Sequence, residues 1–487
     1  MASRFMTKCV YIFCAAVTAI IAIGCLFALE TIYFLAFFAF AALLVFILGK
    51  DKLRPRTFLL CLFIVSFTIK LIFVLIVKTQ PISDFQTFFR AAHYVSEGNY
   101  DIINNSQYFQ DWGYQTGIVL WMTFFVKYFG AGVTFFKVVN CACLAVTNVL
   151  VHLFARRFAS EKAARIAAVI YMLYPGAYFL APVLTNQHLC NALIFGGLFL
   201  YTRKRPESAV KASLIAGSAG LIIALGDAVR PVGIIVVAAA ALAGLIKLLG
   251  DLRKKGALKP LIPLAVMAVT FFLSASLMSA AVKASGVNNV GLTNNFPIWK
   301  FVIGFNHESA GRYSYGDYTG IFLINDREER QEKAETAVRE RLSVPPQTMA
   351  KLIAGKVYHM WMAHDDHHWA FNHITPESGV NVPLIGTVRT RTLLEYAKKI
   401  GGAFYSGAFI LAFFFAASLV KNGKPCGEGL SETALLLFVI FAMYFGAHLL
   451  IEVQMRYRDF ALIPIFALAA AGVDAVAGLR FRKLNAL

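Results

Sequence analysis

Charged residues are scarce in this chain, at 15% of its 487 positions, whereas hydrophobic residues make up 59%. A soluble domain has about a quarter charged and about half apolar residues, so the composition excludes an ordinary soluble protein. The sequence also contains no GxxxxGK(S/T) or GxGxxG loop, no Asp-x-Asp pair and no GxSxG elbow. An activated substrate would therefore reach this protein through the membrane rather than as a soluble nucleotide.

Sequence patterns for zinc sites and disulfides are absent as well. None of the 8 cysteines forms a CxxC pair, and most lie in or beside apolar runs, where we expect small core residues. The formal net charge is +19, but Lys and Arg fall in short blocks between apolar runs rather than on one face. This distribution is typical of cytoplasmic membrane loops and argues against a nucleic-acid partner.

About twelve apolar runs approach the roughly 20 residues that a helix needs to cross a bilayer. They cover approximately residues 9–29, 31–49, 57–78, 133–155, 166–184, 187–203, 210–227, 231–247, 260–281, 402–420, 432–451 and 459–477. Basic blocks follow alternate runs, so the positive-inside rule places both termini in the cytoplasm. The sequence therefore predicts an all-α polytopic membrane protein with an N-terminal module (1–281), an outer loop (282–401) and C-terminal helices (402–487).

The first outer loop, about 79–132, is expected to carry two helices that lie flat on the membrane. In 84–97, apolar residues recur at helical spacing, and Gly98 follows. Residues 114–130 are short for a crossing, and counting them as one would place the next basic block outside. The second outer loop contains a charged segment, 327–342, which is predicted to be a solvated helix.

Asp84 is the first candidate for chemistry, because a carboxylate directly after a membrane span needs a partner or a function. At a helix N-terminus it should stay ionised, which suits a general base or an anchor for a metal or hydroxyl. The alternative is that Ser83 or Asp84 only caps the helix. The two roles are compatible.

Two further charged groups stand at predicted outer ends of apolar runs. Asp227 and Arg230 are three residues apart and Glu452 and Arg456 are four apart, so on a helix each pair could form an ion pair. The functional alternative is that the arginines bind an anionic headgroup, since a guanidinium offers phosphate two parallel hydrogen bonds. Tyr457 and the two acids would then support these arginines.

His364, Asp365 and Asp366 form part of a polar segment that also contains further histidines. Adjacent side chains on a helix point in different directions, so at most two or three of them could converge on a metal ion. A polar loop at the membrane surface is the preferred interpretation. We therefore expect no obligatory metal.

The order of these features resembles the polytopic glycosyltransferases of the GT-C fold. This superfamily includes protein mannosyltransferases, lipid A aminoarabinose transferases and a GPI mannosyltransferase with bacterial relatives. The resemblance is carried by segments in the same order along about residues 57–477: Ser83-Asp84-Phe85, Tyr114 to Gly130, Tyr174-Pro175, Arg230-Pro231, Trp299 to Asn306 with Asp317, and Glu452 to Tyr457. The sequence departs from the family in its lone first-loop acid, in a preceding pair of spans, and in Asn186-Gln187, where many relatives carry a glutamate.

The resemblance implies transfer of one mannose-like or other hexose, with inversion, from a polyprenyl-phosphate donor to a hydroxyl of a glycan, lipid or protein acceptor. Asp84 would be the base, and Arg230 and Arg456 would bind the donor phosphate. Trp299, Asn306, Asp317 and Trp361 would be substrate-loop residues, with the tryptophans stacking on a sugar. A divalent metal is compatible with this activity but not required.

The expected location is a bacterial plasma membrane, with an extracytoplasmic active site. Two other functions remain open from sequence. One is a polymerase or ligase that uses glycans on a lipid pyrophosphate. The other is a secondary transporter, although the paired interrupted spans typical of a midplane transport site are not evident.

Overall fold

A computed structural model of the protein describes residues 2–49, 53–203, 208–251, 258–259, 261–362, 368–373, 378–382, 386–422 and 430–476. The first part of the chain contains α1 (Ala2–Ala28), α2 (Thr31–Gly49), α3 (Pro55–Val77), α4 (Asp84–Ser96), α5 (Asp101–Asn104), α6 (Gln107–Asp111), η1 (Gly113–Gln115), α7 (Thr116–Phe129), α8 (Val133–Ala155), α9 (Glu161–Leu173), α10 (Pro175–Leu180), α11 (Gln187–Tyr201), α12 (Ala209–Val229), α13 (Gly233–Asp251) and α14 (Leu261–Ala284). The second part contains α15 (Trp299–Gly304), α16 (Tyr315–Asp317), η2 (Tyr318–Phe322), α17 (Arg327–Leu342), α18 (Pro346–Val357), η3 (Tyr358–Met362), β1 (Gly379–Val382), β2 (Gly386–Arg389), α19 (Thr390–Asn422), α20 (Leu430–Leu450), η4 (Met455–Arg458) and α21 (Asp459–Val476).

Among the described residues, 9 helical segments of at least 18 residues are apolar enough to cross a membrane. They lie in α1, α2, α3, α8, α12, α14, α19, α20 and η4–α21, and α13 contributes a shorter apolar stretch, Gly233–Leu249. The predicted all-α polytopic fold class is thus confirmed. The described strands form only the small antiparallel hairpin β1–β2, which pairs Gly379 with Arg389.

Besides the run 231–247, which forms the shorter apolar stretch of α13, two predicted spans differ in the structure. Residues 166–184 do not form one helix, because α9 ends at Leu173 and α10 begins at Pro175. Tyr174 is extended, with ψ of 115°, as expected for a residue whose helical conformation clashes with a following proline ring. The run 187–203 forms α11, whose 15 residues are short for a complete crossing.

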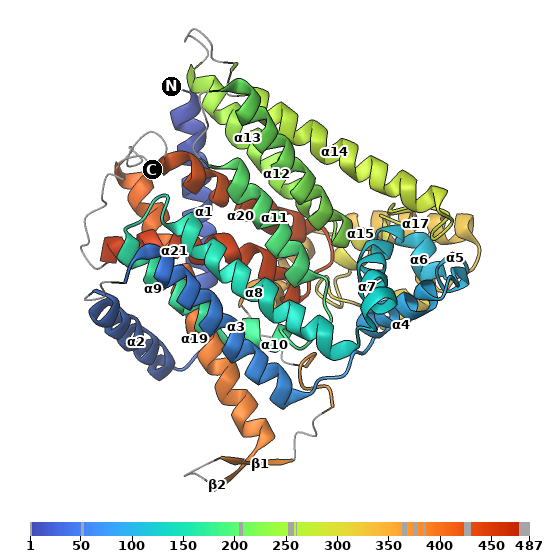
Figure 1. Cartoon of the computed structure of the whole chain (residues 1–487), viewed down its shortest axis with the longest axis horizontal. Coiled ribbons are helices and arrows are strands. Elements are labelled where there is room, and N and C mark those ends of the chain that lie inside the picture. The colour runs from blue at the N-terminus through green and yellow to red at the C-terminus, as the bar shows by residue number, and fades with distance from the viewer. Residues whose placement is uncertain are drawn as a thin grey trace.

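Helix α21 lies at the centre of the bundle, where α8, α9, α19 and α20 pack around it (Figure 1). Every residue from Asp459 to Asp474 is buried. A helix that is hydrophobic on every side is normally enclosed by other helices. The η4 turn, which directly precedes α21, is therefore attached to the most enclosed element of the fold.

Parts of the two segments predicted to be outer loops pack together at one end of the bundle (Figure 1). Helices α4 to α7 of the first loop lie beside α15 and α17 of the second (Figure 1). A buried ion pair between Asp111 and Arg330, 2.8 Å apart, joins the loops. The predicted helices of the first loop and the charged helix 327–342 are present, as α4, α7 and α17.

Candidate active site

Asp84 is the first residue of α4 and lies on the open side of this helix. Phe85, Phe88, Ala92 and Val95 are buried and hold α4 against its neighbours, whereas the Asp84 side chain is 40% exposed. Ser83 occupies the N-cap position but makes no side-chain capping hydrogen bond. The alternative that Ser83 caps α4 does not apply in this structure, and the Asp84 carboxylate remains available.

Arg456 brings a guanidinium group to this carboxylate from the other end of the chain. Its Nη2 lies 4.0 Å from Asp84 Oδ2, and its side chain is 9% exposed. Three rings, those of Phe85, Trp369 and Tyr457, have their centroids 4.8–5.5 Å from the guanidinium carbon. Its Nε donates a 2.7 Å hydrogen bond to Gln454 Oε1. Gln454 thus engages Nε of Arg456, whereas Nη2 lies toward the Asp84 carboxylate.

The predicted ion pair between Glu452 and Arg456 is not present in the described structure, because residues 451–454 are not helical. Glu452 instead contacts Lys300, whose Nζ lies 2.5 Å from Glu452 Oε2. Gln454 Nε2 donates to Glu452 Oε1 at 2.6 Å, and the Tyr457 hydroxyl lies 3.4 Å from Oε2. Burial alone would raise the pKa of Glu452, but the neighbouring Lys300 holds this pKa below its usual value.

The pKa of Lys300 is shifted by the same ion pair. Burial would lower the pKa of its ammonium group, but the attraction of Glu452 raises this pKa above the usual range. Both groups of the pair are therefore charged near neutral pH. Lys300 belongs to α15 in the second outer loop, so this ion pair connects that loop to the segment just before η4.

Arg230 follows the last residue of α12, and its guanidinium group packs against the same Tyr457 ring that Arg456 contacts. Its guanidinium carbon is 4.9 Å from the Tyr457 centroid, and that of Arg456 is 5.5 Å from it. These distances add to 10.4 Å, which is the largest possible separation of the two guanidinium carbons. In the described part of the chain Arg230 has no carboxylate partner; its Nη1 donates to Asn186 Oδ1 at 3.2 Å.

Asp227 does not pair with Arg230. Its Oδ1 accepts a 2.7 Å hydrogen bond from the backbone N–H of Gly233, at the first turn of α13. A carboxylate at this position satisfies a helix N-terminal donor and interacts favourably with the helix dipole. Asp227 thus fixes the turn between α12 and α13, from which Arg230 extends.

Two neighbouring amides link the arginine segments to α11. Asn186 binds the Arg230 side chain and also donates to Val229 O at 3.1 Å. Gln187 Nε2 donates to the backbone oxygen of Arg456 at 2.5 Å. In the sequence, Asn186-Gln187 stands out only as a departure from the family pattern. Lys300, Asn186, Gln187 and Gln454 were all missed as site residues, and only the position of Lys300 within the Trp299 to Asn306 segment offered a signal.

The substrate-loop candidates lie elsewhere. Trp299 and Trp361 are 3% and 1% exposed, packed among Phe296 and Phe322 and among Phe409, Phe441 and Phe445, respectively. Neither ring has an open face for a sugar, so that prediction is wrong. A Trp in an outer loop can equally well fill a core, and sequence does not separate the two cases.

Asn306 and Asp317 are buried and form a hydrogen bond with each other. Asn306 Nδ2 donates to Asp317 Oδ2 at 2.7 Å, and Arg341 forms a two-pronged contact with the same carboxylate. This cluster holds the second outer loop together. His364, Asp365 and Asp366 lie outside the described residues. Within the ranges that the structure describes, no group of 3 or more His, Cys, Asp or Glu residues is arranged to hold a metal ion.

Arg456 also lines a small pocket between α9–α10 and the start of α21. The pocket is lined by Tyr174, Gly176, Leu180, Met455, Arg456, Arg458, Asp459 and Leu462. Asn191 Nδ2 donates to Asp459 at 2.8 Å, and Arg458 donates to Met360 O at 3.2 Å. The site as a whole offers an exposed carboxylate beside guanidinium groups, at the ends of apolar helices. Such a site can bind an anion and accept a proton from a hydroxyl.

Comparison with protein families gives no match, and neither does comparison with curated protein sequences. Comparison with solved structures finds similarity to the archaeal oligosaccharyltransferase AglB from Archaeoglobus fulgidus, solved in complex with an inhibitory peptide and a dolichol-phosphate. The match has 12% sequence identity and a TM-score of 0.43, and it covers 85% of this chain. It covers 50% of the AglB chain, so this protein spans about half the length of that enzyme.

Proposed function

We propose that this protein is a membrane glycosyltransferase that moves a single sugar from a polyprenyl-phosphate donor to an acceptor hydroxyl. The observation that carries the proposal is the 4.0 Å approach of Arg456 to Asp84, with Arg230 and Arg456 both packed against the Tyr457 ring. These three residues come from distant parts of the sequence and meet at the ends of membrane-spanning helices. An acid and two cations at this depth match the chemistry of a lipid-linked phosphate ester.

The two arginines would bind the donor phosphate. The terminal nitrogens of Arg456 can form two parallel hydrogen bonds to phosphate oxygens. Arg230 has no carboxylate partner in the described ranges, so it can neutralise a second oxygen. Because both guanidinium groups sit against the Tyr457 ring, they are fixed before the donor arrives. A fixed positive charge stabilises the phosphate most as it leaves the sugar and gains negative charge.

Asp84 would act on the acceptor. Its exposed carboxylate takes the proton of the acceptor hydroxyl while the hydroxyl oxygen attacks the anomeric carbon. The bond between that carbon and the phosphate oxygen breaks on the opposite face, and the lipid phosphate departs with the electron pair. One displacement of this kind inverts the anomeric configuration.

Substitution of Asp84 by Asn tests the base. Asn keeps the size of the side chain but cannot take a proton, so we expect transfer of radiolabelled mannose from polyprenyl-phosphate mannose to fall by about 10²–10⁴. Polyprenyl-phosphate glucose serves as a second donor. Asp101→Asn is the matched control, since Asp101 is also an exposed first residue of an outer-loop helix. Full activity of Asp84→Asn with a donor that the wild type uses would exclude Asp84 as the base.

Substitution of Arg456 by Ala tests the phosphate site. Loss of a guanidinium that binds an anion in a partly dry site should weaken donor binding about 30-fold or more, with little change in acceptor affinity. Comparison of mono- and pyrophosphate donors in the same assay separates this activity from that of a polymerase or ligase. Flux of an intact substrate in proteoliposomes would instead indicate a transporter.

A further inference from the structure

We propose that Lys300, Glu452 and Gln454 form a positioning relay that keeps the anion-binding side of Arg456 open. In this relay Lys300 forms an ion pair with Glu452, so the Glu452 carboxylate does not pair with the Arg456 guanidinium. Gln454 accepts a hydrogen bond from Nε of Arg456 and thereby fixes the orientation of the guanidinium. The inference rests on the proposed function, because it assigns a role to residues beside the donor phosphate site. None of the three is placed to touch the sugar or the reacting atoms.

The relay is a continuous series of contacts. Lys300 Nζ lies 2.5 Å from Glu452 Oε2. The other carboxylate oxygen, Oε1, accepts from Gln454 Nε2 at 2.6 Å. The amide oxygen of Gln454 accepts from Arg456 Nε at 2.7 Å. Each polar atom of the Gln454 amide thus faces one charged group, and the orientation of the amide is set by the charges on its two sides.

Glu452 would compete with the donor phosphate for the Arg456 guanidinium. It is a buried carboxylate, and only the Gln454 amide separates it from the Arg456 guanidinium. In a partly dry site, a carboxylate without a partner has a strong preference for a nearby guanidinium. Arg456 would then be neutralised by its own chain. Lys300 removes this competition by satisfying Glu452 from a separate segment.

The position of Lys300 does not depend on its ammonium group. The backbone oxygen of Lys300 accepts from Glu452 N at 3.1 Å, and Val453 N donates to Gly311 O at 2.9 Å. Gly304 also lies directly against the backbone of Leu450 and Ile451. Because these contacts use the main chain, a neutral side chain at position 300 leaves the loop attached. Lys300→Met therefore removes the charge and retains most of the fold.

The test measures the affinity of the purified full chain for farnesyl phosphate, a short prenyl monophosphate, and for inorganic phosphate. Lys300→Met should weaken farnesyl phosphate binding about 30-fold or more, because Glu452 is left to compete for Arg456. The double variant Lys300→Met/Glu452→Gln should bind within about threefold of the wild type, because the competitor is gone. Removal of both charges also relieves a merely structural ion pair, so the relay requires that affinity is lost and regained in variants whose unfolding temperatures match that of the wild type.

Inorganic phosphate separates the contribution of the phosphate group to binding from that of the prenyl tail. The relay acts on the charged group, so inorganic phosphate should follow the same order of affinities across the variants, although each value is weaker. A different order would contradict the relay. Thermal unfolding of each variant checks the fold, and Lys399→Met, which breaks the exposed pair with Glu30, is the matched control and should leave both affinities unchanged.

Each remaining outcome decides between the two proposals. Equal affinity of Lys300→Met and wild type would overturn the relay and leave the proposed function intact. A double variant as weak as Lys300→Met would also overturn it, and would assign Lys300 to the anion itself. A wild type that binds neither probe would overturn the donor assignment of the proposed function, and the relay would fall with it.

Discussion

At the scale of single residues, the backbone just before Asp84 is strained. Ser83 has φ of 53° and ψ of −135°, a combination that only glycine adopts freely. The strain places a turn between the end of α3 and the start of α4, and it directs the first residue of α4 toward Arg456. Conformations of this kind cost about 1–3 kcal/mol and are concentrated at functional sites.

Ser83→Gly is expected to increase stability by about 1 kcal/mol. Removal of the strain exceeds the extra unfolded-state entropy of glycine, which is about 0.5–1 kcal/mol. The measurement is thermal unfolding in detergent. Ser106→Gly is a matched control, because Ser106 is also an N-cap residue without a side-chain capping bond but has an ordinary φ of −96°. It should lose stability slightly, and an equal gain in both variants would contradict the strain argument.

The charged residues of the candidate site stand out in the sequence, but the side chains that contact them do not. Asp84, Arg230 and Arg456 are conspicuous because an ionised side chain at the end of an apolar run is rare without a function. Asn186 and Gln454 give no such signal, since an uncharged amide is common in any loop. The partner of Glu452 was predicted to be four residues away, and it is Lys300, 152 positions earlier.

At the scale of elements, α7 positions Arg230 through a close contact with the end of α12. A Cβ atom added at Gly117 would lie 1.8 Å from the backbone oxygen of Ala228, two residues before Arg230. Only glycine permits α7 to approach this closely, so the flat helix of the first outer loop supports the turn that carries the arginine. The break at Pro175 likewise places α10 at the pocket beside Arg456.

Gly117→Ala should therefore destabilise the protein by about 1–3 kcal/mol or more, because the methyl group overpacks against backbone that cannot move aside. It should also weaken donor binding by displacing Arg230. Thermal unfolding and farnesyl phosphate affinity measure the two effects. Gly196→Ala is the control, since nothing lies within 4 Å of a Cβ there, and helix propensity predicts a gain of up to about 1 kcal/mol. A neutral Gly117→Ala would exclude the close contact.

The sequence predicted the type of an element correctly where hydrophobic periodicity and segment length indicated the same structure. The prediction was wrong where the two disagreed. Apolar spacing in 84–97 predicted α4 to within one residue at its C-terminal end. By contrast, α19 begins at Thr390 rather than at the predicted 402. Its first turns are polar, and hydropathy locates the membrane-embedded part of a helix rather than its full length. The Tyr174-Pro175 break shows the same limit in 166–184.

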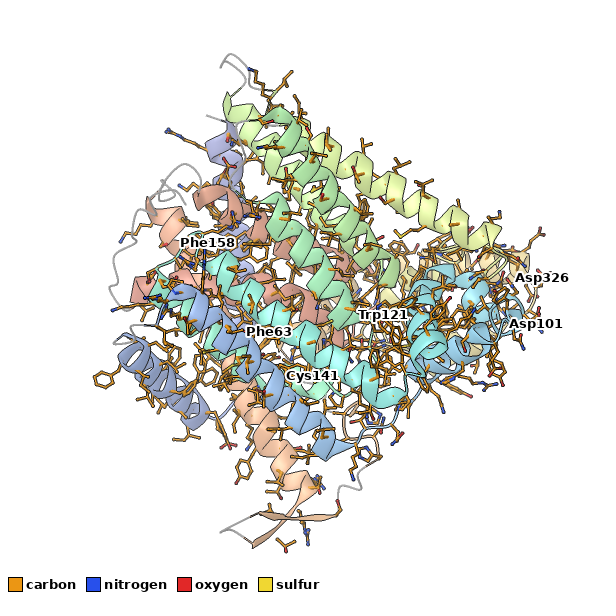
Figure 2. The ribbon with its side chains drawn as sticks, viewed as in Figure 1. Phe63, Asp101, Trp121, Cys141, Phe158 and Asp326 are labelled. Atoms are coloured by element: carbon orange, nitrogen blue, oxygen red, sulfur yellow. The ribbon has the colours of Figure 1, made fainter. Side chains whose placement is uncertain are left out.

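At the scale of the whole molecule, the basic residues and the candidate site lie at opposite ends of the same helices. In α12, Lys211 is in the first turn and Arg230 follows the last. In α20, Glu432 pairs with Lys247 near one end, and Glu452 follows the other end. A helix of about 21 residues spans roughly 32 Å, the thickness of the hydrocarbon core. Phe158, within the basic segment between α8 and α9, lies far from Asp101 of the outer layer in Figure 2.

This separation predicts the orientation of the protein. Because basic residues stay on the cytoplasmic side, Asp84 and its partners should face outward and both termini inward. Single-cysteine variants of a cysteine-free form test this in intact bacterial cells: Glu97→Cys, at the end of α4, should react with a membrane-impermeant maleimide. Lys162→Cys, in the first turn of α9 beside the basic segment, should react only after the cells are opened. The reverse pattern would place the carboxylate in the cytoplasm, where a donor presented at the outer leaflet could not reach it.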